Sequence, residues 1–158
     1  MDTATGLYAP TPPVHLLARE SLSPRPAAGG TFKPEDAGAR GWVLVVEDEP
    51  DALGAIVELL ESEGIPAIGA RHGEEALALI RGGWTPALVL VDLKMPVMDG
   101  WGFCEELEAD EEIRDTPVAI FTASAAVGTL PHRRVDAGFF QKPLDFSRLI
   151  KVANRFCR

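Results

Sequence analysis

The sequence predicts an α/β fold: a doubly wound, five-stranded parallel sheet with helices on both faces. Residues 87–91 are all apolar and run directly into Asp92. Residues 42–46 are also apolar, and they precede Glu47 and Asp48. Apolar runs that end abruptly in a charge are typical of strands buried on both faces of a parallel sheet. Strand-like and helix-like patterns then alternate along the chain, which indicates successive βα units with right-handed crossovers.

The strands are predicted from short apolar runs, each bounded by turn residues or acids. They lie at residues 42–47, 67–70, 87–92, 118–122 and 139–141.

The helices are predicted from apolar residues that recur every three or four positions. They cover residues 51–63, 73–81 and 100–110, with a last helix that follows Asp145 as its N-cap. Gly64 is expected to end the first helix. Between the last two strands, residues 127–138 are expected to hold a shortened or irregular fourth helix, because Gly128 and Pro131 interrupt it.

The first 40 residues are expected to form a disordered, proline-rich tail that precedes a folded domain at 41–158. Six prolines and no sustained periodicity leave this segment too little apolar surface to offset the entropy of ordering. A plain spacer and a ligand for a proline-binding groove both fit this composition.

Charge argues against some partners. The net charge is −9, and residues 1–40 carry four acidic and four basic side chains, so the whole excess belongs to the predicted domain. Such a domain repels phosphate backbones and anionic lipids, so we expect neither nucleic acid nor membrane as a partner.

Without a signal-like start or a long apolar run, the protein is expected to be cytoplasmic. Cys104 and Cys157 are read as two reduced thiols packed in or near helices.

Chemically distinct side chains are expected at the carboxyl edge of the sheet, where ligands bind in open α/β folds. Successive strand ends deliver Glu47 with Asp48, then Asp92, Thr122 and Lys142. Converging carboxylates repel one another, and Mg²⁺ would relieve that repulsion. Lys142 can pair with Asp92 or with a bound anion. This set of groups can stabilise a transferring phosphoryl group, with Asp92 as the nucleophile.

Residues 42–157 resemble the receiver domain of two-component response regulators. The resemblance rests on strand-end motifs in the expected order: Glu47-Asp48, the stretch VDLKMPVMDG at 91–100, Thr122-Ala123 and Lys142-Pro143. It implies a flavodoxin-like sheet with strand order 2-1-3-4-5.

The same resemblance implies a role for each site residue. Asp92 would accept a phosphoryl group from a phosphohistidine. Mg²⁺ would be held by Asp48, Asp92 and the backbone carbonyl of Lys94, with Glu47 acting through a water molecule.

Four further residues take implied roles. Thr122 would donate its hydroxyl to a phosphoryl oxygen, close to the backbone N–H of Ala123. Lys142 would bridge to another phosphoryl oxygen. Phe139 would be the switch aromatic, turning inward when Thr122 moves toward the phosphate. Thr122 as an ordinary strand residue and Phe139 as plain core packing remain alternatives.

We therefore expect a stand-alone receiver without an output domain: a switch rather than an enzyme, which assists its own phosphorylation and dephosphorylation. Its expected partners are a sensor histidine kinase or a histidine phosphotransfer protein, and an unidentified downstream protein. One alternative is an interaction module that keeps the fold but works without phosphorylation. Another is an aspartyl-phosphate hydrolase, although Lys94 stands where such enzymes carry a second catalytic acid.

Overall fold

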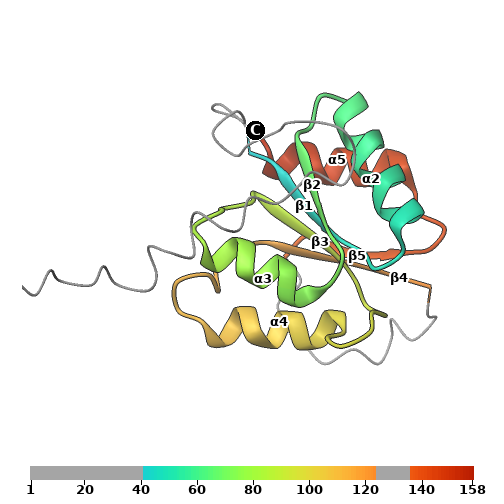
Figure 1. Ribbon diagram of the computed structural model, residues 1–158. Coiled ribbons are helices and arrows are strands. Elements are labelled where there is room, and N and C mark those ends of the chain that lie inside the picture. The colour runs from blue at the N-terminus through green and yellow to red at the C-terminus, as the bar shows by residue number, and fades with distance from the viewer. Residues whose placement is uncertain (1–40, 124–135) are drawn as a thin grey trace, which may run out of the picture.

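A five-stranded parallel sheet forms the centre of the molecule. The structure is a computed structural model that describes residues 41–123 and 136–158. The strands are β1 (Val43–Val46), β2 (Ala67–Ala70), β3 (Leu88–Asp92), β4 (Val118–Thr122) and β5 (Gly138–Gln141). They lie in the order β2-β1-β3-β4-β5, all parallel (Figure 1). The predicted doubly wound sheet and its 2-1-3-4-5 order are confirmed.

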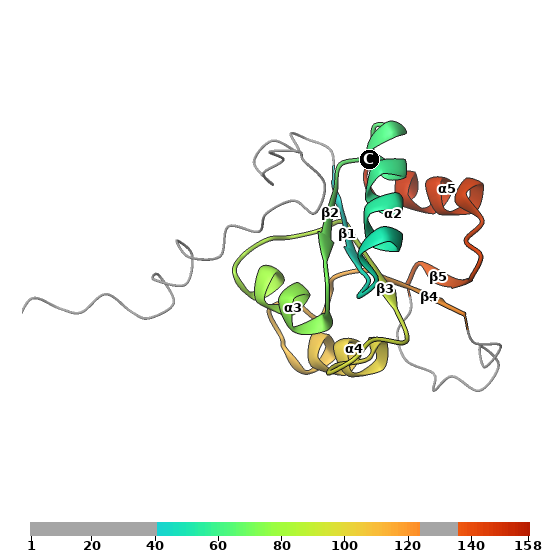
Figure 2. The ribbon, with the colours of Figure 1, turned by 45° about the vertical axis from the view of Figure 1, so that its right-hand side comes forward.

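Helices cover both faces of this sheet. They are α2 (Pro50–Ser62), α3 (Gly73–Arg81), α4 (Gly100–Ala109) and α5 (Phe146–Phe156). In both views of the ribbon, α2 and α5 lie on one face, and α3 and α4 lie on the other (Figures 1 and 2). The sheet is thus the middle of three layers.

Alternate residues of β1 explain the two cores. Side chains of a strand point to opposite faces in turn. Val43 and Val45 pack into the core beneath α2 and α5, whereas Leu44 and Val46 pack into the core beneath α3 and α4. All four are fully buried, which accounts for the unbroken apolar run in the sequence.

The ends of α2 are fixed by local hydrogen bonds. At its start, the Glu49 carboxylate accepts hydrogen bonds from the backbone N–H groups of Ala52 at 2.6 Å and Asp51 at 3.3 Å. At its end, Gly64 has φ of 75°, and its N–H donates to the carbonyl of Glu61 at 2.9 Å. A positive φ costs glycine little, so Gly64 ends the helix as predicted.

The element boundaries agree closely with the sequence prediction. The strands at 67–70 and 118–122 and the helix at 73–81 have the expected limits, and the others differ by one residue at one end or at both. Asp145 is the N-cap of α5, and its Oδ1 accepts a hydrogen bond from the N–H of Arg148 at 3.1 Å. Of the segment predicted to hold an irregular fourth helix, residues 127–135 lie outside the described residues, as does the predicted tail at 1–40. Residues 136–138 are described and form a turn and the first residue of β5.

Within the described ranges, every helix is too short or too polar to cross a lipid bilayer. Both cysteines are buried, as predicted, with Cys104 in α4 and Cys157 at the end of α5, and they form no disulfide bond with each other.

Cys157 is expected to resist alkylation. Burial raises the pKa of its thiol from 9.0 to about 11. Two pKa units leave a roughly one-hundredfold smaller thiolate population at pH 8, and the thiolate is the reactive form. Iodoacetamide labelling followed by peptide mass spectrometry should therefore be about one-hundredfold slower for Cys157 in the native protein than in urea. Equal rates in the two conditions would show that the thiol is not buried in solution.

Candidate functional site

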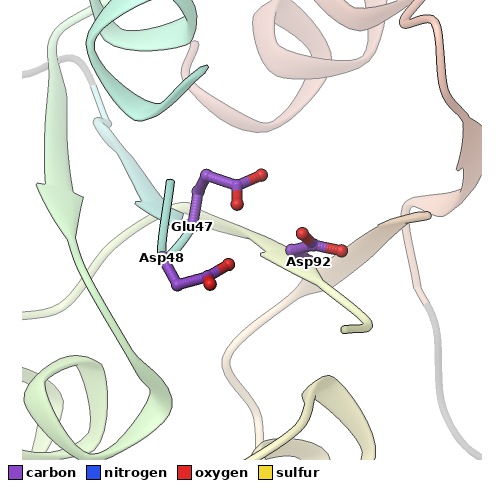
Figure 3. A group of neighbouring side chains, drawn as sticks. All are labelled: Glu47, Asp48 and Asp92. Atoms are coloured by element: carbon purple, nitrogen blue, oxygen red, sulfur yellow. The ribbon is translucent and has the colours of Figure 1, made fainter. Parts of the chain in front are cut away.

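Three carboxylates meet at the carboxyl ends of β1 and β3. Glu47 and Asp48 follow β1 directly, and Asp92 is the last residue of β3. One carboxylate oxygen from each lies within 4.8 Å of the other two (Figure 3). Glu47 and Asp92 are buried, whereas Asp48 is exposed. The structure thus brings together the three acids that the sequence assigned to one edge.

Lys142 joins two of these acids. It follows β5, and its Nζ donates hydrogen bonds to Glu47 Oε2 and Asp92 Oδ2, both at 3.0 Å. The ammonium group also lies 4.9 Å from the ring centroid of Phe121, within the range of a cation–π interaction. The cation is therefore fixed between the carboxylates at the end of the sheet.

Burial and hydrogen bonds act in opposite directions on the pKa values of this cluster. Desolvation raises the pKa of Glu47 to about 7, although hydrogen bonds from Lys142 and from the backbone N–H of Glu49 act in the opposite direction. For Lys142, desolvation alone would lower the pKa, but its hydrogen bonds to Asp92 and Glu47 and their charges raise it above its ordinary value. Lys142 thus stays protonated and offsets the negative charge next to Asp92.

The loop after β3 fixes the backbone around Asp92. Asp92 Oδ1 accepts a hydrogen bond from the N–H of Lys94 at 3.1 Å. The N–H of Leu93 bonds to the carbonyl of Phe121 at 3.0 Å, which ties the loop to β4. The N–H of Gly100, at the start of α4, bonds to the carbonyl of Leu93 at 3.0 Å. These contacts hold the carboxylate at the strand tip.

Residues of β4 and β5 complete the edge. Thr122 is the last residue of β4 and is fully buried, and Ala123 next to it is exposed. The carbonyl of Thr122 accepts a hydrogen bond from the N–H of Lys142 at 2.8 Å, so the two residues are direct neighbours across the sheet. Phe139 is half-buried in β5, and its ring lies 6.4 Å from that of Trp101. The peptide bond before Pro143 is cis.

Some site contacts had no signal in the sequence. Lys142 was expected to pair with Asp92 or a bound anion, but its equally short contact with Glu47 depends on how β5 lies relative to β1. The contact between Trp101 and Phe139 was also missed, because the spacing of two aromatic residues on different elements says nothing of their distance.

Gly100 is expected to tolerate no side chain. A Cβ atom there would lie 2.7 Å from the carbonyl oxygen of Asp92 and 2.9 Å from Cα of Leu93. Because both neighbours are backbone atoms, Gly100→Ala should lower the free energy of unfolding by about 1–3 kcal/mol.

Gly54 provides the matched control for that variant. A Cβ at Gly54, within α2, would meet nothing within 4 Å. Gly54→Ala should therefore raise the free energy of unfolding by about 0.5–1 kcal/mol, because alanine is the better helix former. Urea unfolding of both variants gives the comparison, and equal effects would refute the close approach at Gly100.

Comparison with known proteins assigns the family. Residues 43–154 match the family model described as the response regulator receiver domain. The chain is 32% identical over 118 residues to the polar-differentiation response regulator DivK of Brucella ovis, covering 72% of this chain and 94% of that protein. It is 38% identical over 85 residues to the probable transcriptional regulator ycf27 of Porphyra purpurea, but the aligned residues make up 54% of this chain and only 33% of that protein.

A solved structure agrees. The receiver domain of the Francisella response regulator 1452 superposes with a TM-score of 0.66 at 26% identity, covering 73% of this chain and 95% of the other. Its fold and the family match point to the same conclusion as the strand-end residues. The chain belongs to the response regulator receiver domain family of two-component signalling.

Proposed function

We propose that the protein is a phosphorylation-activated signalling switch whose Asp92 accepts a phosphoryl group from a histidine. The observation that carries this proposal is the placement of the Asp92 carboxylate. It is 4% exposed at the tip of a buried strand, 3.0 Å from the Lys142 ammonium and beside two further acids. A lone solvated acid at a strand end would need none of these neighbours.

The acid cluster fits a magnesium ion. Its donors are all carboxylate oxygens, which hard divalent cations prefer, and the exposed Asp48 leaves room for bound water. We propose Asp48, Asp92 and the backbone carbonyl of Lys94 as direct ligands, with Glu47 acting through water. When bound, Mg²⁺ would supply positive charge for the phosphoryl oxygens.

The proposed transfer uses groups already in place. A carboxylate oxygen of Asp92 attacks the phosphorus of a phosphohistidine, a P–O bond forms and the P–N bond breaks. The electron pair of that bond stays on the imidazole nitrogen, which takes a proton from solvent. Lys142 would hold one phosphoryl oxygen, and Thr122 with the N–H of Ala123 would hold another.

The switch follows from the same residues. We propose that Thr122 moves toward the phosphoryl group and that the half-buried Phe139 turns inward in response. The modified surface would then be recognised by a downstream protein, and the donor would be a sensor histidine kinase or a histidine phosphotransfer protein. The cytoplasmic location and the absence of nucleic acid and membrane partners stay predictions of the sequence.

Acetyl phosphate provides the test of this function. With Mg²⁺ present, the intact mass of the protein should increase by one phosphoryl group, and the modification should be labile to hydrolysis, as an acyl phosphate is. Chelation of Mg²⁺ by EDTA should reduce incorporation to background.

Two other results would favour the alternatives. No incorporation with Mg²⁺ would favour an interaction module that works without phosphorylation. Continuous turnover of a small phosphate ester would favour a hydrolase.

A further inference from the structure

Trp101 and Phe139 form a ring pair beside the proposed site. Trp101 lies in the first turn of α4 and Phe139 lies in β5. Their ring centroids are 6.4 Å apart with an interplanar angle of 52°. Both side chains are half-buried against the core beneath α3 and α4. The Phe139 ring is thus held in part by contact with a residue of another element.

Trp101 is tied to Asp92 through one glycine. The N–H of Gly100 bonds to the carbonyl of Leu93 at 3.0 Å, and a Cβ on Gly100 would lie 2.7 Å from the Asp92 carbonyl oxygen. The first turn of α4 therefore rests directly on the backbone of the proposed acceptor. A shift of that backbone has to move Trp101 as well, because Trp101 is the next residue of a regular helix.

Phe139 is tied to the other half of the site. It is in register with Ile120 of β4, two residues before Thr122, and it precedes Lys142 by three residues on β5. Phe140, the next residue, is 1% exposed and fixed in the opposite core. Of the two phenylalanines in β5, Phe139 is therefore the one that pairs with an aromatic ring of another element and is partly exposed.

We propose that Trp101 is a positioning residue that holds Phe139 in its resting place, and so sets how readily Asp92 accepts a phosphoryl group. This inference rests on the proposed function. Aromatic pairs of this geometry stabilise the state that contains them. The inward turn of Phe139 proposed above would separate the rings. Their contact therefore opposes phosphorylation, and its removal shifts the population toward the phosphorylated form.

Beryllofluoride, which mimics an aspartyl phosphate, allows a calorimetric test in excess Mg²⁺. Trp101→Leu should bind beryllofluoride about two- to tenfold more tightly than wild type, the range that corresponds to loss of one aromatic pair. Trp101→Phe, which keeps a ring, should restore most of the wild-type affinity. In a Phe139→Leu background, Trp101→Leu should change the affinity by less than about twofold, because the two residues act as one unit.

Trp84 provides the matched control. It is also half-buried and also in a ring pair, with Trp42 at 6.1 Å and 87°, but Trp42 precedes β1 at the opposite end of the strand. Trp84→Leu should leave beryllofluoride affinity unchanged. Wild-type affinity in Trp101→Leu, or an effect of Trp101→Leu that persists without Phe139, would overturn the inference.

A measurement on the wild-type protein tests the inference even where Trp101→Leu does not fold. With 5-fluorotryptophan incorporated, the ¹⁹F resonance of Trp101, assigned with Trp101→Phe, should shift on addition of Mg²⁺ and beryllofluoride, whereas that of Trp84 should not. If the wild type binds beryllofluoride and Asp92→Asn does not, the proposed function is supported. If the Trp101 resonance then fails to shift, only this inference is contradicted. If the wild type binds no beryllofluoride, or Asp92→Asn binds it equally well, the proposed function fails and the inference fails with it.

Discussion

Asp92→Asn is expected to reduce phosphoryl incorporation from acetyl phosphate to background. The amide has nearly the shape of the carboxylate and can still accept a hydrogen bond from the N–H of Lys94, which Asp92 Oδ1 accepts at 3.1 Å. It cannot, however, act as the nucleophile that forms an acyl phosphate. The loss should therefore come from chemistry rather than from unfolding, and intact mass after incubation with acetyl phosphate and Mg²⁺ measures it.

Asp145→Asn is the control for that substitution. Asp145 caps α5, and its Oδ1 accepts a hydrogen bond from the N–H of Arg148 at 3.1 Å. Asparagine caps helices about as well as aspartate, so stability and phosphorylation should both be retained. Wild-type incorporation in Asp92→Asn would mean that another residue accepts the phosphoryl group.

Lys142→Gln is expected to slow phosphorylation by about one-hundredfold or more. The ammonium group lies 3.0 Å from Asp92 Oδ2 and is held by Glu47 and by the face of Phe121. A cation fixed where charge builds up needs no reorganisation during the reaction, and removal of one such donor typically costs about 10²–10³ in rate. The initial rate of incorporation from acetyl phosphate at saturating Mg²⁺ is the measurement.

Lys151→Gln serves as the matched control, because Lys151 is exposed on α5. It should phosphorylate at the wild-type rate. The buried Glu47 loses its partner in Lys142→Gln, but burial raises the pKa of its carboxyl, so the group can take up a proton rather than remain as an unpaired charge. The variant should therefore fold, and a rate within about threefold of wild type would remove Lys142 from the proposed mechanism.

The sheet could be predicted because its determinants are local. Residues 43–46 and 88–91 are buried on both faces and therefore apolar throughout, which leaves an unbroken pattern in the sequence. Helix ends could be predicted for the same reason. Gly64 ends α2 through its own positive φ, and Asp145 caps α5 by accepting a hydrogen bond from an N–H three residues later. Local patterns of this kind need no knowledge of the tertiary structure.

Contacts between distant segments could not be predicted in the same way. The acids at the strand ends were expected to meet because parallel strands share an edge, and Glu47, Asp48 and Asp92 do so. The bond from Lys142 to Glu47 spans 95 residues and depends on side-chain rotamers at that edge. The ring pair of Trp101 and Phe139 likewise depends on packing between α4 and β5. The roles assigned to these residues stay predictions.

Chemical trapping of the modified residue tests the central claim most directly. Borohydride reduces an acyl phosphate to an alcohol, which converts a phosphorylated aspartate to homoserine. After incubation with acetyl phosphate and Mg²⁺, reduction and peptide mass spectrometry should find homoserine at position 92, and EDTA should prevent it. Homoserine at another aspartate, or none at position 92 in a protein that has gained one phosphoryl group, would contradict the assignment of Asp92 as the acceptor.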